Sequence, residues 1–218
     1  MILKALEISV VVAVAATATA VISGTFLGWV LARRPFRGRE MLDALFSLPL
    51  VLPPTVTGYY LLVVLGRNGL LGAPLRLAFG FTIPFTLLAC IVAATVMALP
   101  FVVRAARVAF EEIDPRQRLA AASLGAATAR TFWRVEVPLA RRGLAAGAAL
   151  AFARALGEFG ATLMLAGNIP GRTQTLPLAL YEATITGEDA AALVLCAALT
   201  AVSIVVLLSV GRLGRGKL

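Results

Sequence analysis

The chain has 218 residues, of which 60% are hydrophobic and only 14% are charged, a balance that excludes an ordinary soluble globular domain. The net charge of +9 would suggest nucleic-acid binding in a soluble protein, but in so apolar a chain the basic residues must first be placed relative to a membrane. There is no histidine and the two cysteines lack metal-ligand spacing, so we expect neither histidine-based catalysis nor a metal site.

Five apolar stretches are long enough to cross a bilayer, since a spanning helix needs about 20 predominantly apolar residues. They predict an all-α integral membrane protein with transmembrane helices at residues 8–31, 42–65, 83–109, 143–165 and 190–210. A membrane barrel is disfavoured because its strands would alternate apolar and polar residues. The first stretch exceeds the apolar region of a signal peptide, so we expect it to remain in the mature protein.

Basic residues between the spans predict the orientation. The connector at residues 32–39 carries four arginines, and the connector at residues 110–142 carries six. Both are cytoplasmic by the positive-inside rule, which places the N-terminus outside and the C-terminus in the cytoplasm. We therefore expect a single transmembrane domain over residues 1–218 with one large cytoplasmic loop at 110–142.

Prolines interrupt two of these stretches. Pro49, Pro53 and Pro54 lie in the second and Pro84 and Pro100 in the third, and each removes a backbone donor and favours a bend. Such bends either shape a pathway between helices or only reflect the frequent use of proline in membrane helices.

The loop at 110–142 contains a spaced pattern. Leu119-Ala120-Ala121 is followed after three residues by Gly125 and, after nine more, by Val135-Glu136-Val137-Pro138. This spacing resembles the E-A-A-x3-G-x9-I-x-L-P signature of ABC importer permeases, with leucine in place of the glutamate. In physical terms, alanines let a short helix lie in a groove, glycine permits a turn and proline ends an element.

The resemblance implies that this loop is a coupling helix that docks on a cytoplasmic ATPase subunit. The implied contact residues are Leu119, Ala120, Ala121, Gly125, Val135, Val137 and Pro138. The alternative is an interfacial amphipathic helix without a partner, which Arg130 and Arg134 would also suit.

Two later segments narrow the family. The sequences FARALGEFGAT at 152–162 and GNIPGRTQTLPLALY at 167–181 resemble the molybdate permease branch of these importers, and LPLVLPPT at 48–55 is also similar. Sulfate permeases share part of the first segment. The segment from Asn168 to Thr175 follows the fourth span on the external side and combines a Pro-Gly turn with polar donors, so we expect it to contact an external binding protein. The residues expected there are Asn168, Pro170, Gly171 and Arg172. The alternative is a simple connecting turn.

Two ionisable residues lie at membrane depth in the fourth span. Arg154 and Glu158 are four residues apart and can neutralise each other on one helix face. Either they form a structural pair, or they border an oxyanion pathway in which a paired arginine gives an intermediate field. We place Thr55 and Thr162 with them as pathway candidates.

The predicted function is that of a non-catalytic permease subunit of an ATP-driven importer for molybdate or tungstate in the cytoplasmic membrane. The implied partners are an ABC ATPase dimer, which binds ATP and magnesium, an external binding protein, a second copy of the chain and lipid. Nucleic acid and cofactors of its own are not expected. The GxxxxGK spacing at 211–217 is not a phosphate loop, because leucine follows the lysine in place of serine or threonine.

Three alternatives stay open at this point. A sulfate-type permease would share the fold, a proton-coupled secondary transporter would use Glu158 as its proton site, and a membrane scaffold would transport nothing. The coupling-loop pattern favours the importer over the last two.

Overall fold

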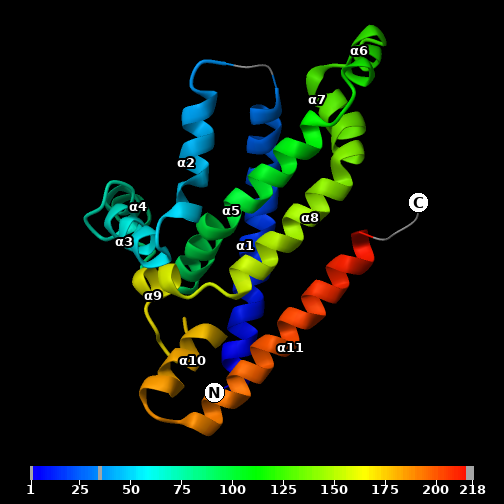
Figure 1. Ribbon diagram of the computed structural model, residues 1–218. Helices are drawn as coiled ribbons and strands as arrows, with labels where there is room; N and C mark the ends of the chain where they lie inside the picture. The colour runs from blue at the N-terminus through cyan, green and yellow to red at the C-terminus, as the bar shows by residue number, and fades with distance from the viewer. Residues whose placement is uncertain (1, 34–35, 215–218) are drawn as a thin grey trace.

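The computed structural model describes residues 2–33 and 36–214, and every regular element within these ranges is helical (Figure 1). The predicted all-α class is therefore confirmed for this part of the chain. In chain order the elements are α1 (Ile2–Ala32), α2 (Arg39–Val51), α3 (Pro54–Leu65), α4 (Gly72–Phe79), α5 (Leu87–Glu111), α6 (Pro115–Ser123), α7 (Thr128–Thr131), the π-helical turn η1 (Phe132–Glu136), α8 (Val137–Leu156), α9 (Gly160–Ala166), α10 (Leu176–Ile185) and α11 (Asp189–Gly214).

The centre of the molecule is the long helix α5, which packs against α1 and α8 (Figure 1). Its buried face consists largely of small residues, among them Ala94, Ala98 and Ala106, which are fully buried. Small side chains allow helix axes to approach closely where a membrane protein cannot rely on the hydrophobic effect between helices.

Glycines on the neighbouring helices complete these contacts. On α1, a Cβ at Gly24 would lie 2.8 Å from the Cβ of Val102, and a Cβ at Gly28 would lie 2.6 Å from the Cβ of Ala106. On α8, Gly143 and Gly147 approach Ala109 and Ala105 in the same way, at 2.5 and 2.8 Å. Both Gly-xxx-Gly spacings therefore serve helix contacts within this chain.

Two helices, α1 and α5, are by themselves long and apolar enough to cross a membrane. Two further stretches qualify only as bent pairs. The chain bends by 116° between α2 and α3, and by 61° between the run Thr128–Leu156 and α9. The stretch Asp189–Val205 of α11 is a shorter apolar helix. The structure thus has at least two apolar spans, and the second and fourth predicted spans are broken helices.

Proline explains the sharper of the two breaks. Leu52 and Pro53 adopt extended or non-helical backbone conformations between α2 and α3, and Pro54 begins α3 at its first turn. Pro49 and Pro100, in contrast, lie inside α2 and α5. Pro53 and Pro54 have no N–H groups that could continue the hydrogen bonds of α2, and a proline in the first turn of α3 loses no helical hydrogen bond. The pair therefore separates the two helices.

The two basic connectors lie at the same end of the molecule (Figure 1). Arg33 at the end of α1 is 3.7 Å from Glu136 of η1, and Arg39 of α2 forms an ion pair with Glu111 at the end of α5. The N-terminus and α10 lie at the opposite end, and α11 runs back towards the basic end. Arg34 and the tail residues Arg215 and Lys217 lie outside the described residues.

Candidate functional site

Helix α6 projects from the basic end of the molecule and carries the first part of the loop signature (Figure 1). Its start is fixed because the Asp114 side chain accepts a hydrogen bond of 2.8 Å from the backbone N–H of Arg116, and Pro115 occupies the first turn. Leu119 is 66% exposed and Ala120 is also exposed, so this helix offers an uncovered surface.

Gly125 ends the projection with a left-handed backbone, at φ 74°. Nothing lies within 4 Å of the position of a Cβ there, so glycine is required by conformation and not by lack of space. Leu124 beside it is 88% exposed.

The second part of the signature lies on a separate element. Val135 belongs to η1, and Val137 and Pro138 begin α8, inside one helical run from Thr128 to Leu156. The expectation that Pro138 ends an element is therefore wrong. Pro138 lies in the first turn of α8, directly after the π-helical turn η1, and the helical run continues through it.

The membrane-depth pair forms as expected from its spacing. Nη1 of Arg154 lies 2.6 Å from Oε2 of Glu158, whose side chain is only 1% exposed. The other carboxylate oxygen, Oε1, accepts a hydrogen bond of 2.7 Å from the backbone N–H of Ala161, in the first turn of α9. Glu158 thus holds the last turn of α8 and the first turn of α9 together across the 61° break.

The two broken segments meet at this point. A Cβ at Gly160 would lie 3.2 Å from Cγ2 of Thr55, and a Cβ at Gly58 would lie 2.7 Å from Cα of Ala161. Helices α3 and α9 therefore touch through backbone, with Thr55 exposed on one and Thr162 buried on the other. All four pathway candidates lie around the α8–α9 break or on the helix packed against it.

The segment at 168–175 is partly held in place by hydrogen bonds to α10. Glu182 of α10 accepts hydrogen bonds from Nδ2 of Asn168, at 2.9 Å, and from Nε2 of Gln174. Residues 173–175 are buried, whereas residues 170–172 are exposed at the Pro-Gly turn. Of the four predicted contact residues, three are exposed and the Asn168 side chain is partly buried against α10.

Three ionisable residues were missed in the sequence. Arg104 and Arg107 lie within the predicted third span, and ionisable residues at that depth are a signal in themselves. Arg107 contacts Asp43 of α2 at 2.9 Å and Glu111 at 3.0 Å, which ties α2 to α5. Glu136, inside the loop signature, is fully buried. Its position within the pattern gave no sign of that burial.

Metal ligation has no support in the part of the chain that the structure describes. No group of three or more Cys, Asp or Glu side chains converges there in a way that could hold an ion. The charged side chains instead pair with one another, as in the Arg154–Glu158 and Arg107–Asp43 contacts.

Comparison with known proteins gives concordant results. The family described as "Binding-protein-dependent transport system inner membrane component" matches residues 24–217. The molybdenum transport system permease protein ModB of Escherichia coli K12 is 47% identical over 171 residues, covering 78% of this chain and 75% of the relative. The sulfate transport system permease protein CysT of Synechocystis is 35% identical, covering 95% and 72%.

The fold is shared with a solved structure of the MetNI methionine ABC transporter. The TM-score is 0.76 at 17% identity, over 99% of this chain and 95% of the other. The present chain, with its broken helices and its projecting α6, thus has the same overall fold as that structure. On the family match and the identity to its relatives, the chain belongs to the family of binding-protein-dependent transport system inner membrane components.

Proposed function

We propose that the chain is the permease subunit of an ATP-driven importer that carries molybdate, or tungstate, into the cytoplasm. The observation that carries the importer class is the family match over residues 24–217, and the exposed helix α6 with its left-handed Gly125 lies at the same end as the basic connectors, as that class requires. Molybdate as substrate is supported by the 47% identity to ModB of Escherichia coli, against 35% to CysT.

The proposed arrangement has five spans, with the N-terminus outside and the chain forming one domain over residues 1–218. Counting each bent pair as one crossing gives four spans, and α11 supplies the fifth. The arginines then lie on the cytoplasmic side, as the positive-inside rule requires. A second copy of the chain completes the pathway, and lipid surrounds the pair.

Helix α6, Gly125 and the start of α8 form the proposed docking site for the ATPase dimer, which binds ATP and magnesium. The contact residues are those of the signature, led by Ala120 and Ala121, whose small side chains leave room for a groove on the partner. The exposed turn at 170–172 at the opposite end is the proposed contact for the external binding protein.

The proposed pathway passes the α8–α9 break. There Arg154 presents a side chain that is 24% exposed and already paired with Glu158. A paired guanidinium attracts a dianion less strongly than a free one, which favours release. Thr55, exposed at the start of α3, offers a hydroxyl on the helix packed against α9.

The test is uptake of radiolabelled molybdate by proteoliposomes that contain this chain, its ATPase and its binding protein. We expect uptake that requires ATP, is inhibited by excess tungstate and is unaffected by a protonophore. Equal inhibition by sulfate would assign the chain to the sulfate type. Uptake that is driven by a proton gradient without ATP would replace the importer by a secondary transporter.

A further inference from the structure

Glu136 is a buried carboxylate at the junction of the coupling loop with the transmembrane helices. Its residue exposure is 0%. It lies in the π-helical turn η1, where the N–H of Val137 bonds to the carbonyl of Phe132, five residues earlier. An ionised carboxylate buried to this degree has to be held by donors or cations.

One hydrogen-bond donor and two guanidinium groups, from two distant segments, surround it. Nε1 of Trp29, on α1, donates a hydrogen bond of 2.6 Å to Oε2 of Glu136. Nε of Arg118, on α6, lies 2.7 Å from Oε1, and Nη2 of Arg33, at the end of α1, lies 3.7 Å from Oε2. One carboxylate therefore joins α1, α6 and the start of α8.

Further contacts brace the same three side chains. The Arg33 guanidinium lies 3.9 Å from the centroid of the Trp29 ring, and the Trp29 ring meets Phe132 edge-on at 4.9 Å. Nη2 of Arg118 donates a hydrogen bond of 2.6 Å to the carbonyl of Phe110, near the end of α5. We call Trp29, Arg33, Arg118 and Glu136 the junction cluster.

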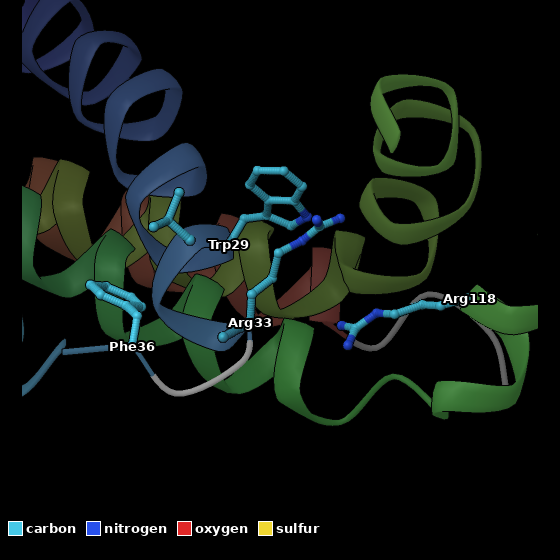
Figure 2. Close-up of a pocket in the computed structure, with 6 residues that line it drawn as sticks. Trp29, Arg33, Phe36 and Arg118 are labelled. Carbon is cyan, nitrogen blue, oxygen red and sulfur yellow. The ribbon is translucent and has the colours of Figure 1, made fainter. Parts of the chain in front are cut away.

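The outer side of the junction cluster faces an open pocket. Trp29 and Arg33 project from α1 and Arg118 from α6 into this pocket, with Phe36 on its rim (Figure 2). The Arg33 and Arg118 side chains are 39% and 29% exposed, while that of Glu136 is 0% exposed. The carboxylate is thus the only member of the cluster enclosed on all sides.

The π turn explains why Glu136 faces inward. Each residue of an α-helix turns the next side chain by about 100°, so one extra residue in a turn redirects the side chains around it. Such π turns occur frequently at functional sites and are rare elsewhere. Here the turn directs a charged side chain into the junction instead of into solvent.

We propose that Glu136 is a positioning residue for coupling: it locks α6 to α1 and α8, so that a displacement of α6 moves these spans with it. This rests on the proposed function in that α6 is taken to be the ATPase-docking element. Without the lock, α6 retains its short connectors to α5 and α7 and the Arg118–Phe110 hydrogen bond, and none of these links it to α1 or to the start of α8.

The test compares Glu136→Gln with Glu112→Gln in the assembled transporter. The glutamine keeps an oxygen to accept from Trp29 but loses the charge that holds the two arginines. Glu112 is exposed at the same end of the molecule and forms no junction contact, so its variant is a matched control. Each complex is assayed for assembly with the ATPase, ATP hydrolysis and molybdate uptake.

We expect Glu136→Gln to assemble and hydrolyse ATP while molybdate uptake per ATP falls by about tenfold, as for the loss of one strongly coupled contact. Glu112→Gln should match the wild type. Unchanged uptake per ATP in Glu136→Gln would overturn the proposal. So would a loss of uptake that only parallels lost assembly, which would make the contact purely structural.

A second measurement does not depend on the substrate. Hydrogen exchange of the full-length subunit in detergent should show faster exchange in 115–123 for Glu136→Gln and Arg118→Met, and not for Glu112→Gln. Equal exchange in all three variants would contradict the lock itself. If exchange changes as expected but wild-type complexes take up no molybdate, the proposed substrate fails and the junction stands.

Discussion

Two buried carboxylates each link separate helices. Glu158 joins α8 to α9 through Arg154 and the backbone N–H of Ala161, and Glu136 joins α1 to α6. A buried carboxylate with one partner removed is costly, so each contact is stabilising only while it is complete. Glu158 thus links the two helices on either side of the 61° bend, and Glu136 links α1 and α6 to the start of α8.

At the residue scale, Arg154 and Glu158 can be tested by single and double substitution. We expect Arg154→Gln or Glu158→Gln alone to destabilise the subunit more than the double change, because each leaves one charge unpaired. Breaking a buried pair costs about 3–5 kcal/mol, and the partial exposure of Arg154 lowers this value. Thermal unfolding in detergent and molybdate uptake are measured on the same three variants.

The outcome separates two roles of the pair. A pathway role predicts that the double variant recovers stability but not uptake, while a structural role predicts that it recovers both. Additive effects of the two single changes would reject the pairing. Glu158→Ala should be less stable than Glu158→Gln, since only the glutamine keeps an acceptor for Ala161.

At the scale of elements, the packing of α1 on α5 depends on glycine. A Cβ at Gly28 would lie 2.6 Å from the Cβ of Ala106 and 2.8 Å from the carbonyl oxygen of Val103. The second of these atoms is backbone, so the helices themselves would have to separate. The close α1–α5 contact also places Trp29 and Arg33 at the junction cluster.

We therefore expect Gly28→Ala to lower the free energy of unfolding by about 1–3 kcal/mol, the usual cost of overpacking. Gly157→Ala is the matched control, because its Cβ would have no neighbour closer than 3.7 Å and its φ is −88°. Chemical denaturation in detergent measures both variants. A Gly28→Ala protein as stable as the control would show that α1 and α5 adjust without cost.

Helix α6 gives a second prediction at this scale. Ala120 is exposed, so Ala120→Trp should leave the thermal stability of the isolated subunit unchanged while it prevents ATPase binding by steric overlap. Ala190→Trp, an exposed position at the start of α11, should affect neither property. Co-purification with the ATPase is the measurement, and normal recovery of the ATPase with Ala120→Trp would remove α6 from the docking site.

At the scale of the whole molecule, the structure separates a basic end from the end that holds the N-terminus and α10. The connectors with Arg33 and Arg39 contact Glu136 and Glu111 at one end, and the N-terminus and α10 lie at the other (Figure 1). Leu176, at the start of α10, donates its N–H to Oγ of Ser9 on α1 at 2.7 Å. This separation supports a fixed orientation in the membrane.

Reporter fusions test that orientation directly. Alkaline phosphatase fused after residue 40 should be inactive, because it would remain in the cytoplasm, and fused after Arg172 it should be active. A cytoplasmic reporter at the same two positions should give the opposite pattern. An active phosphatase after residue 40 would reverse the proposed topology.

Much of this organisation follows from patterns that are local in the sequence. Apolar stretches of about 20 residues give membrane helices, arginine-rich connectors lie together, and the four-residue spacing of Arg154 and Glu158 predicts their contact. The Gly-xxx-Gly spacings predict close approach of helices, but the partner helix α5 cannot be read from them.

The sequence by itself determined the helical membrane class, the basic connectors, the coupling-loop pattern and the charged pair, since each depends on composition or on spacings within a single short segment of the chain. Only the tertiary structure decided that two predicted spans are broken, that α3 and α9 meet at the breaks, and that Glu136 is enclosed by α1 and α6. The physical reason is distance along the chain: Trp29 and Glu136 are 107 residues apart, and helical periodicity carries no information about such a contact.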